Sequence, residues 1–97
     1  MPLGLAVARK LALTTPRLRP ANEGRRYSAP LVKVGGVGPF VYRILSGRLP
    51  AGLRLNTATG RISGVPLRDG RFEIRARVRD SLGAISTQQV RLTVLPA

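Results

Sequence analysis

The sequence contains no cysteine and no histidine, and these two absences exclude several kinds of functional site. Without cysteine there is no disulfide, no thiolate metal ligand and no cysteine nucleophile, and without histidine there is no imidazole base for a catalytic triad. Only four acidic residues occur, and they lack the paired spacing that general acid–base catalysis usually shows: Glu23, Asp69, Glu73 and Asp80. We therefore expect a protein that is not an enzyme.

Long hydrophobic runs are also missing. No apolar stretch approaches the ~20 residues that a helix needs to cross a bilayer, so we expect no membrane span. The first ten residues, MPLGLAVARK, place their basic residues after a short apolar run, which is the reverse of the order in a secretory signal. We interpret residues 1–10 as an N-terminal arm or an extra edge strand. Residues 11–97 have the length of one compact domain.

Positive charge is abundant. The chain has 17 lysine and arginine residues against 4 acidic ones, a formal net charge of +13, and all but Lys10 and Lys33 of the basic residues are arginines. So large a net charge attracts anionic partners, and the planar guanidinium suits phosphate, sulfate and carboxylate groups. The alternative interpretation is that the arginines simply keep strand surfaces solvated.

Short apolar alternations separated by Gly, Pro, Asn and Asp predict strands joined by tight turns. Leu11–Leu18 is expected to be an edge strand that Pro16 interrupts. In Tyr27–Val34 and Phe40–Leu45, one parity is apolar and is predicted to face a core: Tyr27, Ala29 and Leu31, then Phe40, Tyr42 and Ile44.

The clearest strand runs from Asp69 to Asp80. Its alternate residues differ sharply in polarity. One side of the strand carries Phe72, Ile74, Ala76 and Val78, and the other carries Arg71, Glu73, Arg75, Arg77 and Arg79. The last strand repeats this scheme, with Val90, Leu92 and Val94 inward. Ile85 has the wrong parity for that pairing, so we expect a β-bulge or an early twist near residues 86–88.

The most distinctive stretch is Leu49–Pro66, LPAGLRLNTATGRISGVP. It resembles the central segment of Ig-like and dystroglycan-type cadherin-like domains of bacterial and phage surface proteins, and the flanking GVGPFVYRI, GRFEIRARVRDSLGA and QVRLTV are similar to the neighbouring strands of that family. The resemblance covers roughly Leu11 to Val94. It implies an all-β fold, a seven-stranded antiparallel β-sandwich of the Ig-like or cadherin-like type.

One surface is a candidate binding site. If the strand Phe40–Leu45 and the last strand flank the strand Asp69–Asp80, as the resemblance implies, their outward arginines form one patch. We call this patch the basic face, and it comprises Arg43, Arg71, Arg75, Arg77, Arg79 and Arg91. Such a face could engage an acidic protein partner or an anionic polymer.

Nucleic acid and calcium are two further candidate ligands. The sequence has two Tyr, two Phe and no Trp, and no recognition helix or zinc finger, so we expect nucleic acid to bind only without sequence preference, through its phosphates. Glu23 and Asp80 resemble cadherin calcium ligands, but the rest of that acidic pattern is absent and Ca²⁺ takes 6–8 oxygen ligands. We therefore expect no resident cofactor, with Asp80 capping its turn as the alternative to a calcium role.

The resemblance implies a non-catalytic binding, adhesion or spacer module, with a protein partner or neighbouring copies, at an extracellular, cell or virion surface. A second hypothesis is a small stand-alone structural subunit, such as a virion decoration or assembly protein, that docks its basic face on an acidic lattice. A chain that starts with Met1 and holds a whole domain in 97 residues favours the second hypothesis.

Overall fold

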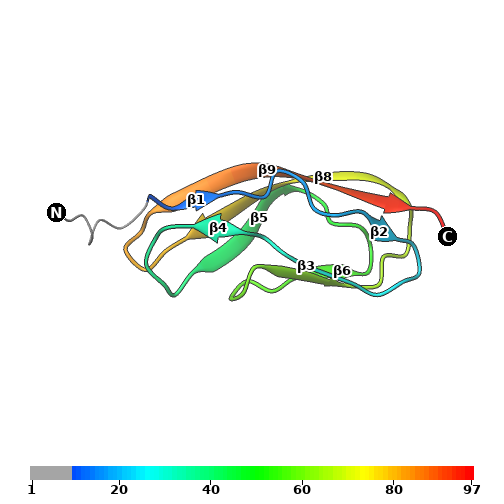
Figure 1. Ribbon diagram of the computed structural model, residues 1–97, viewed down its shortest axis with the longest axis horizontal. Coiled ribbons are helices and arrows are strands. Elements are labelled where there is room, and N and C mark those ends of the chain that lie inside the picture. The colour runs from blue at the N-terminus through cyan, green and yellow to red at the C-terminus, as the bar shows by residue number, and fades with distance from the viewer. Residues whose placement is uncertain (1–9) are drawn as a thin grey trace.

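The computed structural model describes residues 10–97, which form an all-β sandwich (Figure 1). The interpretation of residues 1–10 as an arm or edge strand falls almost entirely outside the described residues. The strands are β1 (Ala12–Leu13), β2 (Ala21–Asn22), β3 (Tyr27–Pro30), β4 (Lys33–Val34), β5 (Val41–Gly47), β6 (Leu53–Leu55), β7 (Arg61–Gly64), β8 (Gly70–Arg79) and β9 (Ile85–Leu95). Within residues 10–97 there is no helix long and apolar enough to cross a membrane.

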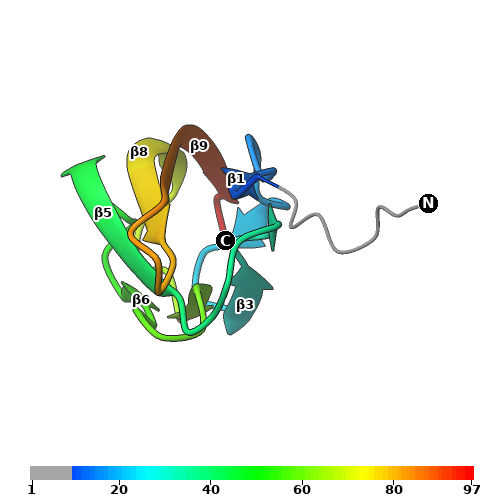
Figure 2. The same ribbon diagram turned by 90° about the vertical axis from the view of Figure 1, so that its left-hand side faces the viewer.

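Two layers enclose the core. A four-stranded sheet with the order β2-β9-β8-β5 faces a three-stranded sheet with the order β3-β7-β6, while β1 and β4 form a separate pair at one end (Figures 1 and 2). Alternate side chains of each strand point between the layers, where the core includes Tyr27, Ile62, Val78, Val90 and Val94. Burying each of the larger aliphatic side chains contributes roughly 1.5–3 kcal/mol to folding.

The pairing of β8 with β9 is continuous from Gly70 opposite Val94 to Arg79 opposite Ile85. The inward parity of both strands is the apolar one that the sequence predicts, with Ile74, Ala76 and Val78 buried in β8. The expected β-bulge near residues 86–88 is absent from this ladder. Ile85 instead points outward and is 53% exposed, because the hairpin tolerates an apolar side chain at its solvent-facing end.

The irregularity lies in β5. This strand pairs antiparallel with β8, and the register shifts between Ile44 and Ser46. Tyr42 and Ile44 keep the predicted inward parity, with Tyr42 buried and Ile44 half-buried. β5 is therefore an edge strand whose outward side chains before the bulge continue the outer surface of β8.

The segment from Leu11 to Glu23 runs alongside β9 and joins it to β4. β1 pairs antiparallel with β4, and Thr15 donates its backbone N–H to Gln88 Oε1 of β9 at 2.8 Å. Further along, Arg17 bridges Arg91 in parallel, and β2 pairs with β9 in parallel as well. Pro16 and Pro20 lack an N–H group, which prevents one continuous ladder.

Two details of the predicted architecture are therefore corrected. The all-β sandwich is confirmed, but the described residues contain nine strand segments in place of seven, since the extended stretches 12–22 and 27–34 are each divided in two. The pairing is also not wholly antiparallel, because β2 and Arg17 run parallel to β9. The parallel pairing belongs to the N-terminal segment beside β9, whereas residues 27–34 are divided because β3 pairs with β7 and β4 pairs with β1.

The stretch Leu49–Pro66 brings two backbone segments into direct contact. Gly52 has φ +95°, and a Cβ atom there would lie 1.9 Å from the carbonyl oxygen of Val65. Gly64 lies at the same backbone contact, since a Cβ atom on Gly64 would lie 2.0 Å from the carbonyl oxygen of Gly52. Beside this contact, the Leu67 N–H donates to the carbonyl oxygen of Ala51 at 2.9 Å. The glycines of this motif therefore serve close backbone packing.

We predict that Gly52→Ala destabilises the fold by at least about 3 kcal/mol, because it combines a backbone clash with a left-handed φ. Gly83→Ala is the matched control, since Gly83 has φ +91° and no atom within 4 Å of its Cβ position. It should cost only about 1–2 kcal/mol, the strain of the left-handed conformation. Urea unfolding of both variants measures the difference, and equal losses would contradict the packing role of Gly52.

Candidate functional site: a basic sheet face

The strand neighbours that the basic face requires are present. β8 lies between β5 and β9, so Arg43 is directly opposite Arg77, and Arg91 is directly opposite Glu73. All six arginines of the basic face lie on the solvent side of the four-stranded sheet, where Arg77 is half-buried and the others are exposed. The sheet thus holds residues that are far apart in sequence on one continuous surface.

One carboxylate lies on the basic face. Glu73 Oε2 accepts hydrogen bonds from Arg91 Nε at 3.1 Å and from Gln89 Nε2 at 3.0 Å. The Arg91 and Glu73 side chains are 66% and 49% exposed, so their ion pair contributes at most about 1 kcal/mol to stability. In the part of the chain that the structure describes, this is the single salt bridge. Glu73 therefore divides the basic face into a compensated half at Arg91 and an uncompensated half around Arg77.

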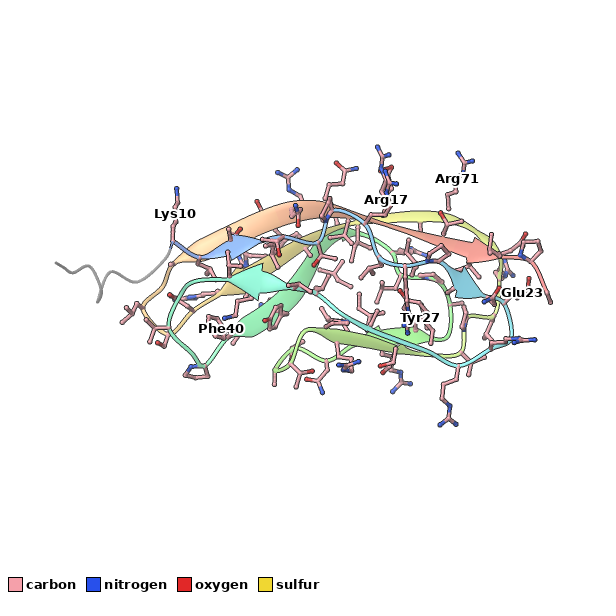
Figure 3. All side chains as sticks on the ribbon, viewed as in Figure 1. Lys10, Arg17, Glu23, Tyr27, Phe40 and Arg71 are labelled. Carbon is pink, nitrogen blue, oxygen red and sulfur yellow. The ribbon has the colours of Figure 1, made fainter. Side chains whose placement is uncertain are left out.

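Arg17 extends this surface beyond the predicted residues. The hydrogen bonds from the Leu18 N–H to the Arg91 carbonyl oxygen and from the Arg91 N–H to the Pro16 carbonyl oxygen fix Arg17 beside Arg91. Its side chain points away from the sandwich on the same side as that of Arg71 (Figure 3). The sequence places Arg17 in a crossing segment, and no local pattern indicates its parallel pairing with β9.

Asp80 organises the turn between β8 and β9. Its side chain is buried, and its two oxygens accept hydrogen bonds from the backbone N–H groups of Val37 at 3.1 Å, Leu82 at 3.0 Å and Ala84 at 2.8 Å. Burial alone would raise the pKa of Asp80, but these donors outweigh burial and hold the pKa below its usual value of 3.8. The capping interpretation of Asp80 matches this geometry, and the carboxylate also ties the loop at Val37 to the hairpin.

Glu23 and Asp80 cannot bind the same ion. The Glu23 N–H donates to the carbonyl oxygen of Leu95, at the end of β9 opposite the hairpin that contains Asp80. The nine residue steps from Ile85 to Val94 separate these ends by about 30 Å at ~3.3 Å per residue. Among residues 10–97 no group of three or more acidic side chains could hold a metal ion.

The aromatic side chains lie away from the basic face. Tyr27 and Tyr42 are buried between the layers, and burial raises the pKa of both phenols. The Tyr27 hydroxyl donates to the carbonyl oxygen of Arg19 at 2.8 Å, and the Lys33 ammonium lies 3.6 Å from the centre of the Phe40 ring. The fourth aromatic residue, Phe72, has the inward parity of β8 and packs against the core. The basic face therefore offers arginines without an aromatic stacking surface.

Comparison with family models gives one match. The model described as "Putative Ig domain" matches residues 10–95, which is most of the chain. No curated protein matches the sequence.

Several solved structures share the fold. A putative alpha-galactosidase from Bacteroides fragilis is 24% identical with a TM-score of 0.73, and the similarity covers 88% of this chain and 17% of that chain. Mouse clustered PcdhgC3 EC1-3 is 18% identical with a TM-score of 0.62, covering 89% and 33%. An endo-fucoidan hydrolase from glycoside hydrolase family 107 is 16% identical with a TM-score of 0.66, covering 100% and 15%. The chain thus spans a third or less of each of these proteins.

The hydrogen bonds of Asp80 make the stability of the fold depend on pH in the acid range. Because the pKa of Asp80 is lowered on folding, its contribution to stability is present above about pH 3.8 and is lost as the pH falls through the folded-state pKa. Asp80→Asn should therefore lower the midpoint of urea unfolding at neutral pH and flatten the decline of that midpoint as the pH falls below about 3.8. Asp69→Asn, at an exposed loop position, is the control and should change stability by less than ~0.5 kcal/mol. An Asp80→Asn protein with the wild-type acid profile would refute the role of this carboxylate.

Proposed function

The chain belongs to the Putative Ig domain family, and we propose that it is a non-catalytic module that attaches a larger protein or assembly to an acidic partner through the basic face. The register of β5 against β8 carries this proposal. It sets Arg43 directly opposite Arg77, where like charges lose stability and folding gains nothing from the second guanidinium. An anionic partner bound between the two guanidiniums attracts both of them and offsets their repulsion.

A non-catalytic role agrees with the chemistry of the side chains. Glu73 is engaged by Arg91 and Gln89, and the oxygens of Asp80 are engaged by backbone donors. Glu23 lies at the far end of the sandwich from Asp80, so these two carboxylates are not arranged to act together in acid–base work. The similarity to short parts of glycosidases and of a protocadherin supports an accessory role, in which another part of the protein supplies any catalysis.

The positions of Lys10 and of the C-terminus suit a connecting module. Lys10 and the C-terminus lie at opposite ends of the long axis, and the basic face runs along the side between them (Figures 1 and 3). Domains joined at either end would leave this side uncovered. We include an extracellular or surface location in the proposal, where the partner is either another protein, a neighbouring copy or an anionic polymer.

The test of the proposed function is a salt series with acidic probes. Wild type and the Arg75→Gln, Arg77→Gln, Arg79→Gln triple variant are measured against heparin, duplex DNA and anionic vesicles. We expect the triple variant to bind the preferred probe at least about tenfold more weakly, and each lost phosphate contact on DNA to reduce the salt slope by about one.

The matched control removes three charges elsewhere. Arg25, Arg54 and Arg68 are exposed and belong to the β2–β3 turn, to β6 and to the β7–β8 loop, so their combined change to Gln lowers the net charge equally without touching the basic face. This control should weaken binding by about threefold or less, the effect of net charge alone. Equal losses in the two triple variants would mean that overall charge, and not the basic face, determines binding.

A further inference from the structure

The hairpin-side half of the basic face concentrates three guanidiniums. Arg43 and Arg77 are opposite each other across β5 and β8, with Cβ atoms ~4.5–5.5 Å apart in such pairs, and Arg79 follows on the same face ~6.6–6.8 Å along the strand. These three residues line one surface hollow together with Pro39, Val41 and Asp80. Their spacing lets three side chains converge on a single anionic group.

The carboxylate in this hollow does not neutralise the three arginines. Asp80 directs both oxygens at the backbone N–H groups of Val37, Leu82 and Ala84, which meet its charge within the hairpin. Glu73 lies farther along β8 and is engaged by Arg91. The guanidiniums of Arg43, Arg77 and Arg79 therefore remain available to a ligand, and no salt bridge within residues 10–97 involves them.

The number of arginines favours a ligand group with three free oxygens. A guanidinium binds oxyanions through a pair of N–H donors, so three arginines around one group present about six donors, more than the roughly four lone pairs of a two-oxygen group can accept. A sulfate ester presents three such oxygens, whereas a carboxylate and the phosphodiester of nucleic acid each present two. Sulfate therefore matches this triad better than a carboxylate or a phosphodiester does.

Neutral polar side chains flank the triad. On β9, Thr87 lies opposite Arg77 and Gln89 lies opposite Arg75, and on β5, Ser46 lies opposite Arg75 on its other side. Hydroxyl and amide groups of this kind both donate and accept hydrogen bonds, as sugar hydroxyls require. Because the aromatic residues face inward, the same surface has nothing on which a nucleic-acid base could stack.

We propose that the hairpin-side half of the basic face binds a sulfated polysaccharide. Arg43, Arg77 and Arg79 hold a sulfate ester. The Thr87 hydroxyl and the amide oxygen of Gln89, whose Nε2 donates to Glu73, hydrogen-bond hydroxyl groups of the neighbouring sugar. This inference rests on the proposed function, since it names the anionic partner of the same surface.

The experiment compares heparin, chemically desulfated heparin and duplex DNA at one ionic strength. Wild type should bind heparin at least about tenfold more tightly than either of the other probes, and Arg43→Gln with Arg77→Gln should lose about tenfold on heparin. The control Arg25→Gln with Arg68→Gln removes the same charge away from the basic face and should lose less than about threefold.

A neutral substitution separates sugar recognition from charge. Thr87→Val removes one exposed hydroxyl with little change in strand propensity, so we expect about threefold weaker binding of heparin and unchanged binding of DNA. Thr57→Val is the control at an exposed position of the turn between β6 and β7 and should change neither affinity. Circular dichroism and urea unfolding verify that each variant is folded.

The outcomes distinguish a failure of the polysaccharide assignment from a failure of the proposed function. If DNA binds as tightly as heparin, or if Thr87→Val affects neither probe, the polysaccharide assignment is wrong, while the proposed function stands as long as the β8 triple variant weakens both probes. If the Arg43 and Arg77 changes leave heparin binding untouched, the triad is not the sulfate site. If the β8 triple variant also binds every probe like wild type, the proposed function fails with it.

Discussion

The antiparallel pairing of β8 with β9 is the constraint on which both the fold and the candidate site depend. This ladder fixes the parity of two long strands at once, so that Val78 and Val90 enter the core while Arg77 and Arg91 reach solvent. A shift of one residue would exchange the two faces and bury guanidiniums without partners, which costs several kcal/mol per charge. The same interaction that builds the core therefore also builds the basic face.

The residues that folding requires differ from those that the proposed function uses. Gly52 and Gly64 allow two backbone segments to touch, and Asp80 closes the hairpin by accepting backbone hydrogen bonds. These residues are accounted for by the fold. Arg43 and Arg77, in contrast, oppose each other at the surface, where their repulsion gives the fold no advantage. Residues that the fold does not explain are the natural place to look for function.

The alternation of apolar and polar residues predicted which side chains of a strand face the core and which face solvent. The alternation in β8 predicted its inward and outward sides, and the resemblance of Leu49–Pro66 to Ig-like domains predicted the sandwich. The parallel pairing of Arg17 with Arg91 was not predictable, because it depends on a proline-interrupted segment running alongside a strand that is far away in the sequence. The bulge was expected in β9 from Ile85 but occurs in β5 after Ile44, since parity alone cannot distinguish a bulge from an outward apolar residue.

We propose that the protein meets its partner at the outer surface of β5, β8 and β9. Amide chemical shifts of the isotopically labelled protein, recorded during titration with a heparin oligosaccharide, test this claim residue by residue. We predict that the largest changes occur in β5 before its bulge, along β8 from Arg75 to Arg79, and at Thr87 and Gln89 of β9. Changes concentrated on β3, β6 and β7, or spread evenly over every exposed arginine, would contradict it.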